Sequence, residues 1–213
     1  MQNFEDLKKE LLSSGIFFDG IRLEDIPAID LYMDQVTTLI DEQTTPSKRH
    51  PEDKPLTKSM IQNYTKNRLL PPPEKKKYSQ EHVILLLFIY YLKDFLSISD
   101  IRAITRPLCE ACFRPEDGSP TIREVYQEIL ALAKDRREAN RQELLSALET
   151  AGAAFSDAPE KNRDFLRTLS LIGILSNDII VRKRLLERLV DRLGEEHEKQ
   201  PVEETPREKR KKA

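Results

Sequence analysis

One run of ten residues, VILLLFIYYL from Val83 to Leu92, constrains the fold more than any other part of the chain. A helix of this composition is apolar on nearly every side, so other elements must surround it in the centre of a core. Because a membrane-spanning helix needs roughly 18 to 20 apolar residues, we expect a core helix over about residues 80–95, with Ser79 as its N-cap. At 38% hydrophobic residues, the 213-residue chain has enough apolar side chains to bury this helix.

The segment before this helix is stiff and strongly basic. It reads LLPPPEKKKYS over residues 69–79. Proline fixes φ, so we expect the three lysines to project from a rigid turn. The stretch from Lys48 to Lys77 has a net charge of +6, whereas the whole chain carries −2, which leaves −8 on the remainder. A basic patch on an acidic body predicts an anionic partner, such as nucleic acid.

The helix before the prolines, about residues 57–68 with Thr57 at its N-cap, has a polar outer face. Met60, Ile61 and Tyr64 share one side at helical spacing, and this side should face the core. Asn and Gln can pair with adenine, and lysine can neutralise phosphates, so the opposite side is a candidate DNA surface. The alternative for each of these polar residues is ordinary solvated surface. The candidate DNA-binding residues of the helix and the turn are Lys58, Gln62, Asn63, Lys66, Arg68, Lys75, Lys76 and Lys77.

The order of these segments resembles the DNA-binding domain of the MerR family. The matching residues are Tyr64, Leu69-Leu70-Pro71, Tyr78-Ser79 and Ser97-Ile98-Ser99-Asp100-Ile101. The resemblance implies a winged helix-turn-helix over residues 22–106, with residues 57–68 in the major groove and the wing, residues 71–77, on phosphates. It also implies a transcriptional regulator that binds double-stranded DNA as a homodimer. The N-terminal half, including IPAIDLYMDQV and LTKSMIQNYTKN, is similar to a bacterial family, domain of unknown function 1836.

The rest of the chain predicts helices, so we expect an all-α protein. Residues 1–21 would hold a short helix at 3–14, and Asp30 to Glu42 a helix followed by a loop at 43–55. Residues 107–194 would form a helical C-terminal region, a long helical hairpin, and the charged residues 195–213 a disordered tail.

Within the C-terminal region the expected boundaries follow from caps and prolines. A short helix capped by Ser97 or Ser99 would end before Pro107, and residues 107–119 would form a break. A long helix would then begin with Ser119 as the cap and Pro120 in the first turn, and run to about residue 150. Arg136, Arg137 and Asn140 interrupt its apolar stripe. It can therefore pair either across a dimer or within the chain, against a last helix at 161–193.

Catalytic and metal chemistry has little support in the sequence. Cys109 and Cys112 form a single CEAC motif, and a zinc site would need two more ligands, so we expect no metal and no cofactor. An inducer or redox site at these cysteines is the alternative to two semi-buried side chains. The chain has no P-loop, glycine-rich dinucleotide turn, HExxH or GxSxG motif, so we expect no enzyme.

Two cysteines and no signal-peptide pattern predict a cytoplasmic protein. The second functional hypothesis is a helical protein-interaction adaptor that keeps the winged fold without binding DNA.

Overall fold

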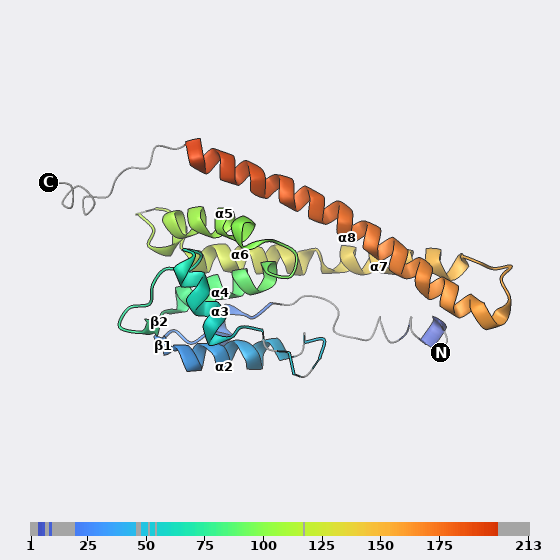
Figure 1. Cartoon of the computed structure of the whole chain (residues 1–213), viewed down its shortest axis with the longest axis horizontal. Helices are drawn as coiled ribbons and strands as arrows, with labels where there is room; N and C mark the ends of the chain where they lie inside the picture. Colours follow the sequence, from blue (N-terminus) through green and yellow to red (C-terminus); the bar gives the residue numbers. More distant parts are fainter. Residues whose placement is uncertain are drawn as a thin grey trace.

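The computed structural model of the chain describes residues 4–6, 9, 20–45, 48–50, 52–53, 55–116 and 118–199 (Figure 1). Helices dominate it, which confirms the all-α expectation at that level. The elements are η1 (Leu23–Asp25), β1 (Leu31–Tyr32), α2 (Met33–Thr44), α3 (Lys58–Lys66), β2 (Lys77–Tyr78), α4 (Gln80–Leu92), α5 (Ile98–Leu108), η3 (Cys109–Phe113), α6 (Ile122–Asp135), α7 (Arg137–Ala153) and α8 (Glu160–Lys199). Most of the predicted helix at 3–14, and the predicted tail beyond residue 199, lie outside the described residues.

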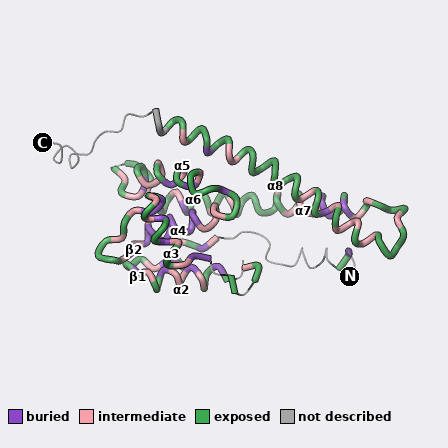
Figure 2. Tube along the Cα trace, viewed as in Figure 1, coloured by how far each residue is buried: buried purple, intermediate pink, exposed green. Residues whose placement is uncertain are grey.

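α4 lies in the centre of the core, as its composition predicts (Figure 2). Six of its side chains are at most 1% exposed: Val83, Ile84, Leu85, Leu86, Leu87 and Ile89. α4 packs against α5, α6 and β2, while Ile40 of α2 and Ile61 of α3 belong to the same buried cluster. Because full burial of a leucine-sized side chain is worth about 1.5–3 kcal/mol, α4 supplies a large share of the hydrophobic stabilisation.

A short antiparallel sheet ties the start of α2 to the start of α4. Leu31 pairs with Tyr78, and Tyr32 pairs with Lys77. The side-chain amide of Gln80, the first residue of α4, donates to the Ile26 carbonyl oxygen (2.7 Å) and holds the segment before β1 in place. Each strand has only two residues, which is too short for an alternating pattern to be read from the sequence.

Three of the predicted helix caps are confirmed, at Thr57, Ser79 and Ser97, and one is wrong. Met60 N–H donates to Thr57 Oγ1 (3.2 Å), and Asp100 N–H donates to Ser97 Oγ (3.2 Å). Ser119, in contrast, does not cap α6. Thr121 does, because its N–H donates to the Glu124 carboxylate (2.7 Å) and Glu124 N–H donates back to Thr121 Oγ1 (3.2 Å). This reciprocal capping box satisfies two free N–H groups, and Ser119 has no acidic residue three positions later to form one.

The predicted break at residues 107–119 begins too early. α5 continues through Pro107 to Leu108, and the π-helical turn η3 extends the helical backbone to Phe113. A proline inside a helix costs about 3 kcal/mol because it removes one hydrogen bond and crowds the preceding turn. Ile101 and Cys112, on either side of it, are both buried, and this burial offsets the cost.

The single long helix expected at 120–150 is divided into two, α6 and α7, which meet at Arg136. This is where three polar residues interrupt the apolar stripe. α7 packs against α8 within the chain, through a small cluster that includes Leu148, Ala151 and Leu171. The second half of α8 then lies over α5 (Figure 1). α8 reaches Lys199, so residues 195–199, which the sequence analysis assigned to the tail, are helical.

Candidate nucleic-acid interface

α3 presents a polar face to solvent because its apolar side chains are anchored in the core. Ile61 is fully buried and Tyr64 is 4% exposed. The helix therefore turns its other side outward, and the four predicted groove residues are all exposed: Lys58, Gln62, Asn63 and Lys66. The structure thus places these four side chains together on one helix face, as the spacing predicts.

The end of α3 is a Schellman motif with an arginine at its left-handed position. Leu69 N–H donates to the Tyr64 carbonyl (2.9 Å), and Arg68 N–H donates to the Thr65 carbonyl (3.1 Å). Arg68 has a φ of 60° and an exposed side chain. The motif turns Leu69 and Leu70 into the core, where both are at most 1% exposed.

The lysines that follow the prolines belong to a tight turn that leads into β2, on the left of the helical body in Figure 1. Lys77 N–H donates to the Glu74 carbonyl (2.8 Å), and the two residues form an antiparallel bridge. Lys75 and Lys76, between them, have φ values of 49° and 65° and are exposed. Two successive residues with positive φ are typical of a type I′ turn.

Lys77 differs from its two neighbours. It belongs to β2 and is only partly exposed. Its Nζ lies 5.3 Å from the centre of the Tyr32 ring, which is a cation–π contact. The three predicted wing lysines are therefore two exposed residues at the tip and one residue held against the sheet.

Ion pairs with carboxylates compensate part of the basic charge of this region. Lys58 pairs with Asp34 of α2, so its charge is largely compensated in this structure. Glu74, the acidic residue of the turn, pairs with Arg114, which follows η3. Among the candidate residues, four exposed basic side chains have no ion pair with a carboxylate of any described residue: Lys66, Arg68, Lys75 and Lys76. The connection from α3 to β2 therefore carries uncompensated positive charge.

The two amide residues on the α3 face are not equivalent. Asn67 Nδ2 donates to Asn63 Oδ1 (2.8 Å) and to the Asn63 carbonyl (2.9 Å). One acceptor site of the Asn63 side chain is thereby occupied, which leaves its amide N–H groups as donors. Gln62 has no such contact among the described residues, so it keeps both the donor and the acceptor that adenine recognition requires.

His82 supports the turn from inside. Ser79 N–H donates to His82 Nδ1 (3.1 Å), and the ring lies edge-on to Tyr78 and Phe113, at centroid distances of 5.7 and 4.9 Å. The side chain is 4% exposed, and Nε2 has no hydrogen-bond partner among the described residues. Burial lowers the pKa of His82, so the imidazole is held neutral behind β2.

The CEAC motif lies on η3, whose last residue, Phe113, contacts the His82 ring. Cys112 is buried, and burial raises the pKa of the Cys109 thiol to about 12. Such a thiol stays protonated at neutral pH, which opposes metal binding and redox reactivity. Within the described part of the chain, no cluster of three His, Cys, Asp or Glu side chains could hold a metal ion.

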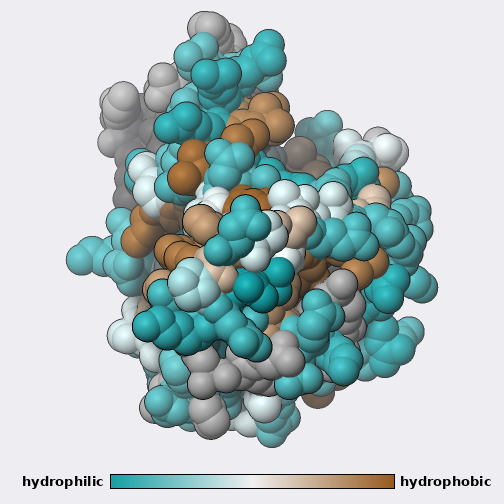
Figure 3. All heavy atoms as spheres, turned by 90° about the vertical axis from the view of Figure 1, so that its right-hand side faces the viewer, coloured by the Kyte–Doolittle hydropathy of each residue, from teal (hydrophilic) through white to brown (hydrophobic). Residues whose placement is uncertain are grey.

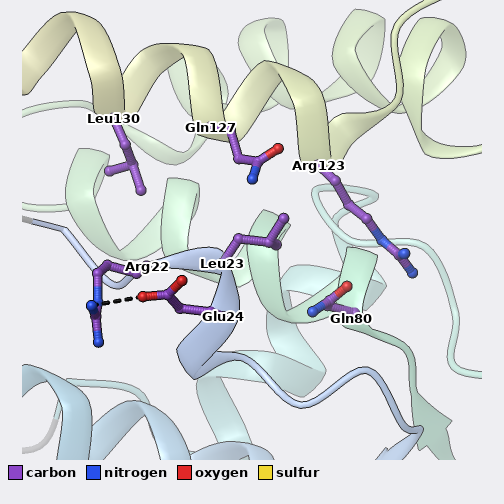
Figure 4. A pocket seen from close by; sticks show the side chains of 7 residues that line it. All are labelled: Arg22, Leu23, Glu24, Gln80, Arg123, Gln127 and Leu130. Carbon is purple, nitrogen blue, oxygen red and sulfur yellow. Dashed lines mark ion pairs between the residues drawn. The ribbon is translucent and has the colours of Figure 1, made fainter.

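An open hollow of about 480 Å³ lies between η1 and the N-terminal ends of α4 and α6 (Figure 4). Its two arginines are already paired: Arg22 with Glu24 (2.6 Å) and Arg123 with Glu81 (2.5 Å). Gln80 is committed to the Ile26 carbonyl. The hollow therefore offers no uncompensated charge to an ionic ligand.

Three residues of this region could not be found from the sequence. Arg114 reaches Glu74 across 40 positions, Tyr32 lies under Lys77 only because β1 pairs with β2, and Phe113 meets His82 through the unexpected continuation of α5. No local pattern signals contacts of this kind.

Among the described helices, none is long and apolar enough to cross a bilayer.

These features define a helical protein with a small antiparallel sheet and a basic connection beside an exposed helix face. The chain belongs to the family described as Domain of unknown function (DUF1836), whose model matches residues 21–129. The match runs from η1 into α6 and includes every residue of the candidate interface. No curated protein matches the chain, and no solved structure does.

Proposed function

We propose that this protein is a DNA-binding transcriptional regulator of MerR-like type, active in the cytoplasm. One observation carries the proposal: α3 exposes a polar face that ends at Lys66, and the connection that follows it carries three more uncompensated basic side chains, Arg68, Lys75 and Lys76. A rigid basic turn beside an exposed helix is the arrangement with which a winged helix-turn-helix grips duplex DNA.

The order of elements supports this arrangement. β1, α2, α3, β2 and α4 follow one another as a helix pair flanked by a small sheet, and the turn before β2 takes the place of a wing. In the proposed complex, α3 lies in the major groove, where Gln62 and Asn63 meet base edges. Lys66, Arg68, Lys75 and Lys76 meet phosphates, and Lys58 can do so after it leaves Asp34. Lys77 supports the turn through Tyr32.

We further propose that the regulator is a homodimer and that α8 supplies the interface. Residues 176–185 of α8 are all exposed, because this part of the helix lies between its contacts with α7 and with α5. Figure 3 looks onto the end of the molecule where α7 turns into α8 and shows apolar side chains on that surface. The exposed large apolar residues of α8 are Phe165, Leu169, Ile172, Ile179, Ile180, Val181, Leu185, Leu189 and Leu193.

At helical spacing, Phe165, Leu169, Ile172, Ile179 and Ile180 fall on one side of α8, and Val181, Leu185, Leu189 and Leu193 fall on another. If each side chain contributes on the order of 80 Å², the first group offers about 400 Å², which is half of the roughly 800 Å² per partner of a standard interface and would form the apolar centre covered by a second copy of the chain. Light scattering should give a dimer for the wild type and a monomer for I172K/I179K, with an unchanged melting temperature for the fold. A monomeric wild type would contradict the homodimer.

The same apolar surface favours the second candidate, a protein-interaction adaptor, if DNA binding fails. Selection from a pool of random-sequence duplexes separates the two functions. The wild type should enrich a defined sequence, and Q62A should relax the preference at the contacted base pair, whereas K75A/K76A should weaken binding uniformly. If the wild type enriches no sequence and retains no duplex, the regulator proposal is wrong and the adaptor is preferred.

A further inference from the structure

Four non-glycine residues in the described part of the chain have a positive φ: Arg68, Lys75, Lys76 and Phe155. Three of the four are basic, and these three lie on the single connection between α3 and β2. Phe155 lies in the turn between α7 and α8, at the opposite end of the molecule (Figure 1).

Left-handed backbone is unfavourable for L-residues with a Cβ atom, least so for asparagine, and glycine adopts it freely. The position of Arg68 in a Schellman motif is most often glycine. A type I′ turn such as the one at Lys75 and Lys76 is most often Asn-Gly. The fold by itself would therefore be more stable with glycine at Arg68 and with Asn-Gly at the two lysines.

Contacts within the chain do not repay this strain. The side chains of Arg68, Lys75 and Lys76 are exposed. None of them forms an ion pair or a side-chain hydrogen bond with a described residue. Backbone strain that is kept without an internal benefit is concentrated at functional sites, where the side chain serves a ligand.

We infer that Arg68, Lys75 and Lys76 are retained for contact with the phosphodiester backbone of the bound nucleic acid, at a cost to the stability of the fold. This inference rests on the proposed function and adds to it. It explains why three of the proposed phosphate contacts come from strained positions, one just after α3 and two at the tip of the turn. Fixed backbone at all three positions limits the space that the long cationic side chains sample, so less conformational entropy is lost on binding.

The test compares stability and affinity in the same variants. R68G and K75N/K76G introduce the residues that the backbone prefers and remove one and two charges, respectively. Each relieved position should raise the melting temperature by about 2–4 °C. Each lost phosphate contact should lower affinity for a random-sequence duplex about eightfold at 0.1 M salt, because the contact contributes a salt exponent of about 0.9.

Two controls isolate the effect. F155G relieves the same kind of strain far from the interface and should leave the affinity unchanged. K134Q/K161Q removes two exposed charges from α6 and α8 and should change the affinity by less than about twofold, through screened long-range electrostatics alone.

The outcomes are distinct. A higher melting temperature with weaker binding in both connection variants is the expected result. An unchanged or lower melting temperature would overturn the inference, because the fold would then need the basic residues. If the wild type and both variants bind DNA with equal affinity, the inference is also wrong, but the proposed function is unaffected. A wild type that binds no duplex would refute the proposed function itself.

Discussion

Arg114 should influence DNA affinity without touching DNA, because it neutralises Glu74 beside the two exposed lysines of the turn. Both side chains of this ion pair are largely exposed, at 77% and 72%. An exposed pair contributes at most about 1 kcal/mol to stability, so R114A should fold normally. The freed carboxylate, however, would lie close to the DNA. At a distance of about 8 Å in water, a carboxylate and a phosphate repel by about 0.5 kcal/mol, which weakens binding roughly two- to threefold.

A double-mutant cycle measured by fluorescence anisotropy tests this reasoning. R114A should weaken binding in the wild-type background and have no effect in the E74Q background, where no carboxylate remains. E74Q alone should bind at least as tightly as the wild type. The effect of R114A should fade as the salt concentration rises above about 0.1 M, where the screening length falls below 10 Å. An equal loss of affinity in both backgrounds would refute the account, since Arg114 would then contact DNA directly.

Three further predictions concern the fold that carries the interface. L86A should lower the free energy of unfolding in urea by about 2–5 kcal/mol, and a loss below 1 kcal/mol would contradict the central place of α4. T57A should cost about 1 kcal/mol through loss of the α3 cap, measured in the same way; no loss would mean that the cap does not stabilise α3. Burial lowers the pKa of His82 in the folded protein. Its contribution to the free energy of unfolding is therefore fully present above the unfolded-state pKa of about 6.5. As the pH falls below that value the unfolded chain gains a proton first, and stability declines by up to about 1.4 kcal/mol per pH unit. H82Q should therefore lose less stability than the wild type between about pH 7.5 and 5.5, and an equal loss would exclude His82 as the cause.

The sequence predicted the elements whose signal is local. α4 is apolar on all sides, so it could be placed in the centre of the core. α3 has buried residues at helical spacing after a threonine cap, so its outward face could be predicted. The exposure of the candidate residues on α3 followed directly, because a helix with one anchored side has only one free side. The turn after the prolines was also expected, since proline and a lysine run are strong markers.

The parts that were missed depend on contacts between distant segments. Cys112 is buried against the core, and this burial favours continuation of the helical backbone beyond Pro107. The proline had predicted that α5 would end before it. Thr121 rather than Ser119 capped α6 because the reciprocal Glu124 lies at the right spacing only for Thr121. The pairing of Glu74 with Arg114 and of Lys77 with Tyr32 arises from the folded chain, and no short stretch of sequence encodes either contact.

The positive φ values of Arg68, Lys75 and Lys76 could not be read from composition either. Positive φ is expected at glycine or asparagine, and basic residues give no such signal. Only the hydrogen bonds of the Schellman motif and of the turn fix the backbone there.

A salt titration of binding to a random-sequence duplex tests the central claim most directly, with the wild type beside K75A/K76A and the control K134Q/K161Q. The wild type should lose affinity log-linearly with salt, and K75A/K76A should reduce the slope by roughly 0.9 for each lost phosphate contact, about 1.8 in total. The control should keep the wild-type slope. If the wild type fails to bind even at about 50 mM salt, or if K75A/K76A keeps the wild-type slope, the basic turn does not grip duplex DNA.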